Sequence, residues 1–299
     1  MAGFVTRFAP SPTGPLHLGH AYSALLAHDM AVATGGTFLL RIEDIDRSRC
    51  RPEWEAQIYD DLRWLGLWWP EPVMRQSTRL ATYQAALDRL WSLDLLYPCS
   101  CTRRDIEQAL SAPQEGVALP HGPDGLVYPG TCRSSGLSLS LMERPKDAVL
   151  RLDMRMATAI CEHHITAPHG AEWTIGFQET GKAHRGWVTT TRESYAADIG
   201  DIVLARREMG TSYHLSVVLD DAAQGITDVV RGEDLFEATR IHVLLQRLLG
   251  LPTPTYHHHP LIRDAAGKRL AKRDDARALS KYRSEGATPD DIRALVGLG

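Results

Sequence analysis

Cysteine is scarce in this chain: 299 residues contain five, at positions 50, 99, 101, 132 and 161. A disulfide-stabilised secreted domain would need a denser, even-numbered set. The N-terminus lacks a charged segment followed by an apolar run and a cleavage site, so we expect no secretory signal. No uninterrupted apolar stretch approaches the roughly 18 residues of a membrane-spanning helix. We therefore expect a cytoplasmic protein that has no membrane partner.

The chain also lacks a strong excess of either charge, since 33 Lys and Arg oppose 37 Asp and Glu for a formal net charge of -4. This excludes a protein that is basic throughout, although a nucleic-acid partner needs only a local basic face. With 43% hydrophobic and 23% charged residues, the composition is that of an ordinary soluble globular protein. The length allows two domains, or one nucleotide-binding domain with a sizeable insertion.

The first forty residues predict a βαβ unit. Phe4 to Ala9 has the pattern of a buried strand, and the Pro- and Gly-rich residues 10–15 continue neither strand nor helix. Leu18 to Ala33 is rich in helix formers and is followed by two glycines, after which Thr37 to Ile42 predicts a parallel strand. This unit builds doubly wound parallel α/β sheets, whose ligands bind at the carboxyl ends of the strands.

The rest of the chain alternates between helical and strand patterns. We expect helices at 54–65, 82–95 and 236–249, strands at 149–154 and 226–230, a strand pair formed by Ile202–Arg206 and Tyr213–Leu219 with its turn at Met209-Gly210, and an irregular insertion at 111–136.

Two histidines stand at the start of the first predicted helix. His17 and His20 lie three positions apart, so both imidazoles can face one notch. A helix start carries unpaired N–H groups and partial positive charge, which suits phosphates. Two imidazoles there would stabilise charge on an α-phosphate as pyrophosphate leaves, and Gly19 would let a nucleotide approach the backbone. The alternative is that both histidines only cap and pack the helix.

The whole segment RFAPSPTGPLHLGH, residues 7–20, resembles the N-terminal signature of class I glutamyl- and glutaminyl-tRNA synthetases. The likeness continues through RIEDID, residues 41–46. It implies a Rossmann-type class I catalytic domain, with ATP bound by His17, Gly19 and His20. We expect Mg²⁺ to accompany the ATP.

The same resemblance implies a set of contacts to L-glutamate. Arg7 would hold the side-chain carboxylate, Glu43 would lie near the ammonium, and Ser11 would complete the contacts. The chemistry suits a zwitterion, because an arginine fork binds a carboxylate at two points. Tyr213 and Arg231 lie in SYHLSVVLDD and VVRGEDL, which are similar to stretches of the family, and are implied as further contacts. Outside the resemblance, these residues would be ordinary loop charges and a strand aromatic.

A basic run at residues 268–273 resembles the mobile second signature loop of the family, written K-M-S-K-S. Lys272 matches identically and Leu270 replaces methionine, whereas Ala271 and Arg273 lack the hydroxyls. The resemblance implies that Lys272 is catalytic together with the two signature histidines and reaches the β- and γ-phosphates of ATP. In isolation, such a run would be a solvated set of charges.

Two other clusters suggest metals but are interpreted differently. Asp220 and Asp221 have no neighbour that completes a ligand set, so we expect a structural turn. The imidazoles of residues 257–259 would point to alternate faces of a strand and so cannot converge on one ion. We expect the histidines at 163, 164 and 169 to lie on the surface.

Three cysteines at 99, 101 and 132 provide ligands for zinc in a reduced compartment, and tetrahedral closure requires a fourth. The arrangement resembles the zinc site of the glutamyl-queuosine tRNA(Asp) synthetase family, in which the fourth ligand is a tyrosine at the position of Tyr128. The resemblance implies one structural Zn²⁺ bound by Cys99, Cys101, Tyr128 and Cys132. Such an ion would stabilise an insertion that cannot build its own core. The alternative is three unrelated thiols.

The likeness extends from Arg7 to Arg273. It implies three regions: residues 1–96 as the first half of the catalytic domain, 97–200 as an insertion with the zinc site and an acceptor-type subdomain, and 201–299 as the second half with the K-M-S-K-S-like loop and a short helical tail.

Only residues 274–299 follow this region, whereas glutamyl- and glutaminyl-tRNA synthetases carry a large C-terminal anticodon-binding domain. In this respect the chain is similar to the glutamyl-queuosine tRNA(Asp) synthetase family. The resemblance implies a ligase that activates L-glutamate with ATP and transfers it to queuosine in the anticodon stem-loop of tRNA(Asp), and we expect a monomer. Two alternatives stay open: a glutamyl-tRNA synthetase core that charges the tRNA 3' end, and a non-catalytic, zinc-stabilised RNA-binding module.

Overall fold

The computed structural model of the chain describes residues 3–111, 119–133, 138–163, 174–262 and 277–299. Its helices are α1 (Leu18–Ala33), α2 (Pro52–Trp64), η1 (Gln76–Thr78), α3 (Leu80–Ser92), α4 (Arg103–Ser111), α5 (Met154–His163), α6 (Arg192–Ser194), η2 (Tyr195–Ile199), α7 (Tyr213–Ala223), η3 (Glu233–Leu235), α8 (Phe236–Leu249), α9 (Leu279–Ser284) and α10 (Pro289–Val296). Its strands are β1 (Val5–Phe8), β2 (Thr37–Ile42), β3 (Met74–Arg75), β4 (Leu96–Cys99), β5 (His121–Gly122), β6 (Gly125–Leu126), β7 (Val149–Leu152), β8 (Thr174–Glu179), β9 (Gly186–Thr191), β10 (Val203–Ala205), β11 (Asp228–Gly232) and β12 (Thr255–His259).

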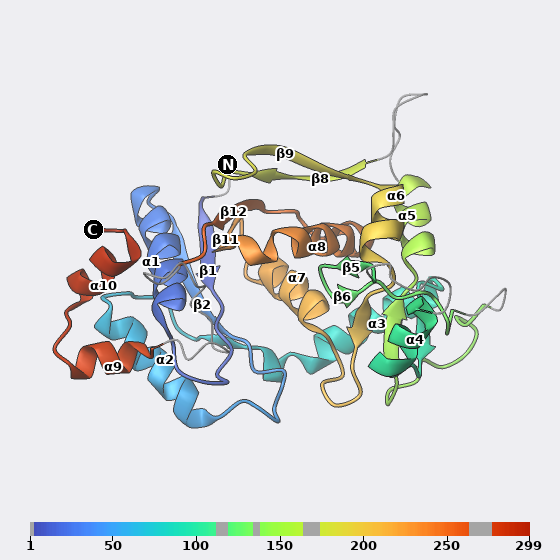
Figure 1. Cartoon of the computed structure of the whole chain (residues 1–299), viewed down its shortest axis with the longest axis horizontal. Coiled ribbons are helices and arrows are strands. Elements are labelled where there is room, and N and C mark those ends of the chain that lie inside the picture. Colours follow the sequence, from blue (N-terminus) through green and yellow to red (C-terminus); the bar gives the residue numbers. More distant parts are fainter. Residues whose placement is uncertain (1–2, 112–118, 134–137, 164–173, 263–276) are drawn as a thin grey trace.

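A parallel sheet forms the centre of the molecule. One part has the order β1-β2-β3 and the other the order β11-β12-β8-β9, in which only β9 runs antiparallel to its neighbour. The Thr227 N–H donates to the Val5 carbonyl at 2.9 Å, which places the residue that leads into β11 beside β1. The strand order therefore reverses between β1 and β11 (Figure 1). This confirms the predicted doubly wound α/β fold and places a ligand crevice at the reversal.

The predicted βαβ unit is confirmed as β1, α1 and β2. The core-facing residues of α1 are fully buried, among them Ala21, Ala24, Leu25 and Ala27. A Cβ on Gly36 would lie 2.2 Å from the Phe4 carbonyl oxygen. Only glycine therefore lets the chain turn from α1 into β2 so close to β1.

The predicted strand at Tyr213–Leu219 is wrong, because this segment belongs to helix α7. The Ser212 hydroxyl caps the helix by accepting the Leu215 N–H at 3.4 Å. Valines at 217 and 218 favour a strand only weakly, and in α7 both are buried in the core. The turn at Met209-Gly210 is present, but β10 pairs with β7 rather than with a strand at 213–219.

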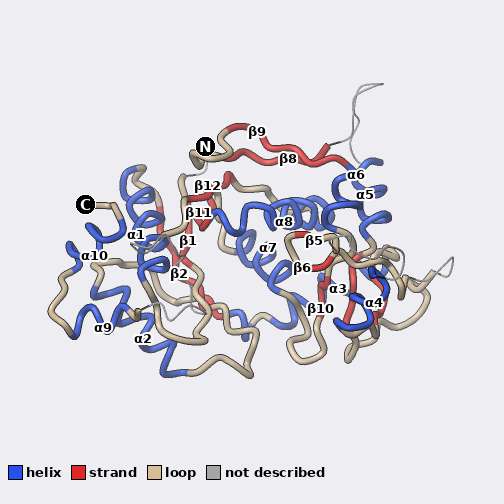
Figure 2. The backbone as a smooth tube through the Cα atoms, viewed as in Figure 1, coloured by secondary structure: helices blue, strands red, loops and turns tan. Residues whose placement is uncertain are grey.

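The strands predicted at 149–154 and 202–206 are present as β7 and β10, and they form an antiparallel sheet with β4. Within residues 97–200, the segment predicted as irregular contains the short β5–β6 hairpin, which the sequence pattern did not predict. β8 and β9 also lie in this range, and they extend the central sheet beyond β12. Figure 2 shows the β5–β6 hairpin beside the β10 end of the molecule.

The helical tail packs against α1. The Leu279 N–H donates to the Leu16 carbonyl at 2.8 Å, and Arg293 pairs with Asp29 at 2.8 and 2.9 Å. Leu279 is fully buried, so α9 contributes to the core around α1 (Figure 1). Among the described residues, no helix is both long and apolar enough to cross a bilayer.

Candidate functional site

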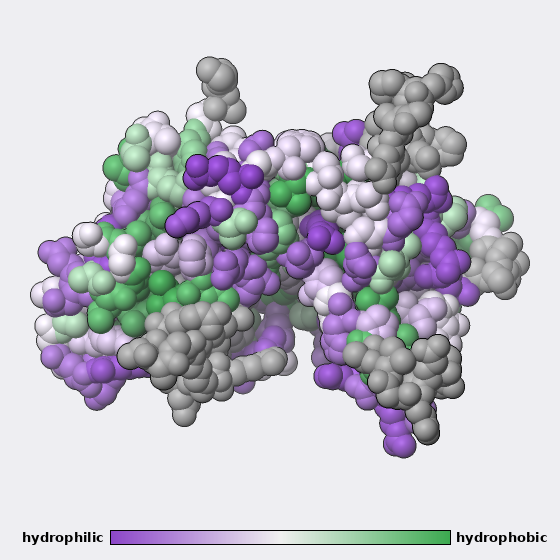
Figure 3. All heavy atoms as spheres, turned by 45° about the horizontal axis from the view of Figure 1, so that its top comes forward, coloured by the Kyte–Doolittle hydropathy of each residue, from purple (hydrophilic) through white to green (hydrophobic). Residues whose placement is uncertain are grey.

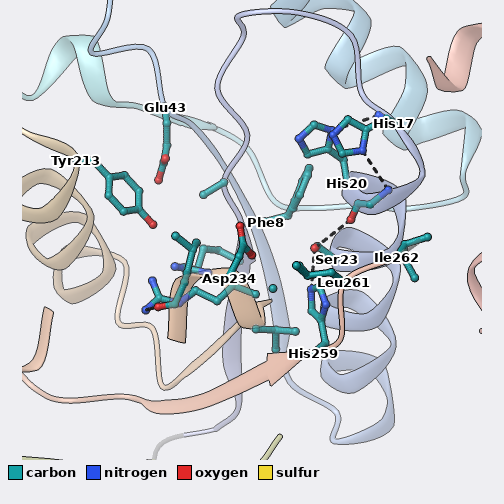
Figure 4. Close-up of a pocket in the computed structure, with 17 residues that line it drawn as sticks. Phe8, His17, His20, Ser23, Glu43, Tyr213, Asp234, His259, Leu261 and Ile262 are labelled. Atoms are coloured by element: carbon teal, nitrogen blue, oxygen red, sulfur yellow. Dashed lines mark hydrogen bonds between the residues drawn. The ribbon is translucent and has the colours of Figure 1, made fainter. Parts of the chain in front are cut away.

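A cavity of about 370 Å³, called here the first cavity, opens where β1, β11 and β12 end. It is lined by Arg7, Phe8, Ala9, His17, Gly19, His20, Ser23, Glu43, Tyr213, Val230, Arg231, Gly232, Asp234, Leu235, His259, Leu261 and Ile262. Figure 4 shows the two signature histidines on one side of the cavity and Glu43 with Tyr213 on the other. Figure 3 shows the molecular surface notched between two lobes.

The signature histidines form the N-terminal cap of α1. His17 Nδ1 accepts the Gly19 N–H at 3.1 Å, and His20 Nδ1 accepts the His17 N–H at 3.2 Å. The two rings lie 3.8 Å apart between centroids. Because each Nδ1 accepts, each neutral ring carries its proton on Nε2. Capping therefore fixes both imidazoles as Nε2–H donors at the edge of the cavity.

Arg7 enters the cavity as part of a buried charge cluster. Its guanidinium binds the Asp221 carboxylate at 2.8 and 3.2 Å, and Arg41 binds the same carboxylate at 2.6 Å. Arg41 also donates to Glu43 at 3.2 Å. Burial alone would raise the pKa of Asp221, but Arg7 and Arg41 outweigh it and lower that pKa to about 2. The cluster fixes Arg7 and Glu43 at adjacent points of the wall.

Asp220 and Asp221 are buried within α7, so the predicted structural turn at these residues is wrong. Asp220 accepts hydrogen bonds from Arg79 at 2.6 Å, Tyr83 at 2.8 Å and Gln76 at 2.9 Å. Both aspartates are therefore anchors between α7 and the first half of the chain. Their partners lie more than 130 positions away in sequence, which is why local pattern gave no signal.

Arg231 is buried at the end of β11 and is 6% exposed. Its guanidinium donates to His258 Nε2 at 3.1 Å, His242 Nδ1 at 3.1 Å and Thr239 Oγ1 at 2.6 Å. All of these partners are neutral acceptors, and within the described ranges no carboxylate forms an ion pair with Arg231. A buried cation without a counter-charge is costly, so this wall of the first cavity favours an anion.

Two histidines to which the sequence analysis assigned no role in the site hold Arg231. His258 accepts from Arg231 and donates from Nδ1 to Glu179 at 2.5 Å. The pKa of His242 is held well below its usual range, by burial first and then by Arg231. The prediction that residues 257–259 lie on a strand is confirmed by β12. His258 and His259 are both buried beside the cavity, where they act as hydrogen-bonding groups.

A second cavity of about 350 Å³ adjoins the first. Glu43, Tyr213 and Leu235 line both, so these side chains form a wall common to the two cavities. Ser11 lines the second cavity together with Asp124. Of the residues implied for ATP and glutamate, seven therefore line the first cavity: Arg7, His17, Gly19, His20, Glu43, Tyr213 and Arg231. Lys272 and the histidines at 164 and 169 lie outside the described residues.

The predicted zinc ligands converge on one point. The Sγ atoms of Cys99, Cys101 and Cys132 lie within 4.8 Å of one another. The Tyr128 hydroxyl lies 3.5 Å from Cys99 Sγ and 3.3 Å from Cys101 Sγ. Ligand atoms of a tetrahedral site with Zn–S bonds of about 2.3 Å are separated by roughly 3.8 Å, so the set fits zinc.

Comparison with known proteins gives the context of this site. Residues 4–165 and 178–298 match the family described as tRNA synthetases class I (E and Q), catalytic domain. The chain is 66% identical over 294 residues to a glutamyl-Q tRNA(Asp) synthetase of Rhodobacter capsulatus, covering 98% of this chain and all of that protein. It is 41% identical to a protein of the same name from Nocardia farcinica, covering 98% of this chain and 84% of that one.

Solved structures of glutamyl-tRNA synthetases share the fold. A glutamate tRNA ligase from Elizabethkingia meningosepticum, in complex with its amino acid, aligns with a TM-score of 0.72 and 26% identity. The glutamate-tRNA synthetase of Elizabethkingia anophelis aligns with a TM-score of 0.73 and 25% identity. Both alignments cover all of this chain but only 61% and 62% of those chains. The chain thus spans less than two thirds of the length of these structures.

Proposed function

The chain belongs to the family of the glutamyl-Q tRNA(Asp) synthetases, within the class I tRNA synthetases of the E and Q type, and from this membership we propose its reaction. The protein is a synthetase-like ligase that uses ATP, glutamate and tRNA. The specific reaction that we propose is activation of L-glutamate as glutamyl-adenylate, followed by transfer to the queuosine in the anticodon of tRNA(Asp).

The observation that carries the amino-acid assignment is the environment of Arg231. Its buried guanidinium meets only neutral acceptors in the described structure, whereas the charge of Arg7 is already matched by Asp221. A carboxylate of the substrate would supply the counter-charge that Arg231 lacks. Glutamate carries two carboxylates, and Arg7 and Arg231 line the same cavity.

Glu43 would receive the ammonium group. Burial raises the pKa of its carboxyl group even though Arg41 and Arg7 act to lower it. A substrate ammonium beside Glu43 would favour the ionised carboxylate and so gain a charge-assisted contact. Tyr213 lines the same side of the cavity and would contact the amino acid. Ser11 would contact it from the second cavity.

In the first step, a carboxylate oxygen of glutamate forms a bond to the α-phosphorus of ATP, and the bond from that phosphorus to the bridging oxygen breaks. Pyrophosphate leaves, and a Mg²⁺ ion bound with ATP would neutralise its charge. His17 and His20 would donate from Nε2 to the phosphate oxygens as charge develops on them. Lys272 would reach the β- and γ-phosphates, as the resemblance implies.

In the second step, a hydroxyl on the cyclopentene ring of queuosine attacks the activated carbonyl carbon. The carbon–oxygen bond to AMP breaks, AMP leaves, and the hydroxyl proton is released. This sequence needs no protein nucleophile, so positioning and electrostatics supply the catalysis.

We propose that Cys99, Cys101, Tyr128 and Cys132 hold one structural Zn²⁺. Four protein ligands would leave no open position for chemistry on the metal. Binding would tie β4, which carries Cys99, to the segment after β6, which carries Tyr128 and Cys132. The role is therefore to fix the insertion rather than to activate a substrate.

The test is incubation of the protein with labelled glutamate, ATP and tRNA that either contains or lacks queuosine. The proposal expects label only in queuosine-containing tRNA. It also expects labelling of tRNA whose 3' terminal diol has been oxidised with periodate beforehand, provided that queuosine itself is protected from the oxidation. Labelling that is equal in both tRNAs and is lost on oxidation would identify a 3'-charging core instead. Glutamate-dependent exchange of pyrophosphate into ATP without tRNA would exclude a non-catalytic RNA-binding module.

A further inference from the structure

The second cavity has the position required of an acceptor site. It shares Glu43 and Tyr213 with the first cavity as a common wall, so a group bound in it would lie next to the proposed amino-acid site. Its remaining walls combine hydroxyls from the signature loop with Asp124 of the insertion and with Arg206 and Met209, which follow β10. The second cavity is therefore assembled from both parts of the chain.

A hydrogen-bonded chain runs from Arg231 in the first cavity to Asp124 in the second. Arg231 Nη1 lies 3.1 Å from His242 Nδ1, His242 Nε2 lies 3.1 Å from His214 Nδ1, and His214 Nε2 lies 3.3 Å from Asp124 Oδ1. His214 and His242 are both buried. These contacts join the two cavities through the interior of the protein.

The direction of every bond in this chain is determined by its ends. A guanidinium can only donate, so His242 Nδ1 accepts and its proton lies on Nε2. His242 then donates to His214 Nδ1, and the proton on His214 Nε2 donates to Asp124. Both imidazoles are neutral, and the chain links a cation in one cavity to an anion in the other.

Asp124 is presented to the second cavity by the β5–β6 hairpin, four residues before Tyr128. Its side chain is 30% exposed, and within the described ranges His214 is the partner found for its carboxylate. Burial acts to raise the pKa of Asp124, but the hydrogen bond from His214 and the charges of Arg206 and Arg151 outweigh it and lower that pKa. One carboxylate oxygen is thus engaged, while the group as a whole still faces the cavity as an anion.

We propose that the second cavity binds the hydroxyl-bearing nucleoside that accepts glutamate, and that Asp124 recognises it by accepting a hydrogen bond from one of its hydroxyls. His242 lines neither cavity and His214 lines the second, and both are positioning residues because they hold Asp124 and Arg231 in a common geometry. This inference rests on the proposed function and assigns the acceptor subsite within it.

Asparagine and alanine separate the two roles of Asp124. In Asp124→Asn, the side-chain carbonyl still accepts from His214, so Arg231 stays in place but the anion is lost. In Asp124→Ala the hydrogen-bonded series that starts at Arg231 lacks its final acceptor, so the Arg231 side chain is held less firmly in position. Glu193→Gln is the matched control, since Glu193 is an exposed acid of the insertion in α6.

The three variants are compared in glutamate-dependent pyrophosphate exchange without tRNA and in glutamate transfer to queuosine-containing tRNA. We expect Asp124→Asn to keep its exchange rate and its KM for glutamate, and to lose transfer about 10- to 100-fold, as for a charged hydrogen bond. Asp124→Ala should lose transfer and also show a raised KM for glutamate with an unchanged KM for ATP. Glu193→Gln should match the wild type in both assays.

Transfer by Asp124→Asn at the wild-type rate would overturn the proposal. If this variant loses exchange as well, Met209→Trp provides an independent test, because it fills the second cavity from another wall. Transfer should then be lost while exchange is retained, and unimpaired transfer would again overturn the proposal. Failure of the proposed function has a different signature, since the wild-type protein itself would then label tRNA irrespective of queuosine.

Discussion

Arg7 and Asp221 form a two-point ion pair across 214 positions of sequence, with Nε–Oδ1 and Nη2–Oδ2 distances of 2.8 and 3.2 Å. The pair joins β1, which leads into the signature loop, to α7, which carries Tyr213 into the first cavity. Arg41 shares the same carboxylate. One aspartate in a helix therefore sets the position of two arginines on neighbouring strands of the sheet.

Replacing Asp221 by asparagine should destabilise the fold strongly. Two buried guanidiniums would lose their common counter-charge, and removing one partner from a buried charge network costs about 3–5 kcal/mol. The free energy of unfolding in urea measures the loss. Asp60→Asn is the control, because Asp60 pairs with Arg283 at an exposed site, and we expect it to cost about 0–1 kcal/mol. Equal losses in the two variants would contradict the anchoring role.

The same carboxylate predicts a pH dependence of stability. The pKa of Asp221 is about 2 in the folded protein, against an ordinary value of 3.8. A carboxyl group with a lowered folded-state pKa stabilises the protein above its unfolded pKa and loses that contribution as the pH falls through the folded value. The contribution should therefore disappear as the pH is lowered from 3.8 to about 2. As the pH is lowered across this range, the free energy of unfolding should fall more steeply for the wild type than for Asp221→Asn.

Arg231→Gln should act on glutamate rather than on ATP. The substitution removes the buried cation that lacks a carboxylate partner in the described structure, while the amide still donates hydrogen bonds nearby. Loss of one partner of a buried charge pair costs about 2–5 kcal/mol, which is roughly 30-fold or more in the KM for glutamate. Pyrophosphate exchange at varied glutamate and varied ATP separates the effects. Equal increases in both KM values would contradict a glutamate contact.

Arg7→Ala should likewise raise the requirement for glutamate far more than that for ATP. Its effect on stability should be smaller than that of Asp221→Asn, because Arg41 still neutralises the Asp221 carboxylate at 2.6 Å. Kinetic and unfolding measurements on the same preparation distinguish the two consequences. A KM for ATP that rises as much as that for glutamate would remove Arg7 from the amino-acid site.

Local pattern was sufficient where one segment determines its own structure. The loop and helix of residues 10–33 carry prolines, glycines and helix formers in sequence order, and β1, α1 and β2 follow the prediction closely. The cysteines at 99, 101 and 132 were grouped by spacing and resemblance, and their Sγ atoms converge. Seven of the residues implied for ATP and glutamate line one cavity, because they lie near the ends of β1, β2 and β11 or at the starts of α1 and α7.

Pattern failed where tertiary contacts decide. The segment Tyr213–Leu219 has a residue pattern that predicts a strand, yet it forms part of helix α7, in which most of its side chains are buried. The sequence assigned no role in the site to His242 or His258, because their importance comes from contact with Arg231 across different elements. Asp124 lies in a segment predicted as irregular, 90 positions from its partner His214. Only the folded chain brings such groups together.

The cysteine cluster predicts a metal content that mutation can test. Cys101→Ser should lower bound zinc from about one equivalent per chain towards zero, because three ligands cannot close a tetrahedral structural site. Cys161→Ser is the matched control, since Cys161 is buried outside the cluster and should leave zinc unchanged. Elemental analysis of purified protein gives the result. Equal zinc in the wild type and Cys101→Ser would exclude the site.

The signature histidines can be tested for chemistry separately from capping. His17→Asn should keep the cap of α1, because asparagine is among the best N-cap residues and its carbonyl can accept the Gly19 N–H that His17 Nδ1 accepts now. The Nε2–H donor is lost, so pyrophosphate exchange should fall about 10²- to 10³-fold, as when a donor to developing charge is removed. The free energy of unfolding, measured by thermal denaturation, should change by less than about 1 kcal/mol. His17→Ala, which loses both functions, should be impaired in stability as well as in exchange. If His17→Asn retains full exchange and only His17→Ala is impaired, then His17 serves the helix alone and the phosphate role falls to other groups.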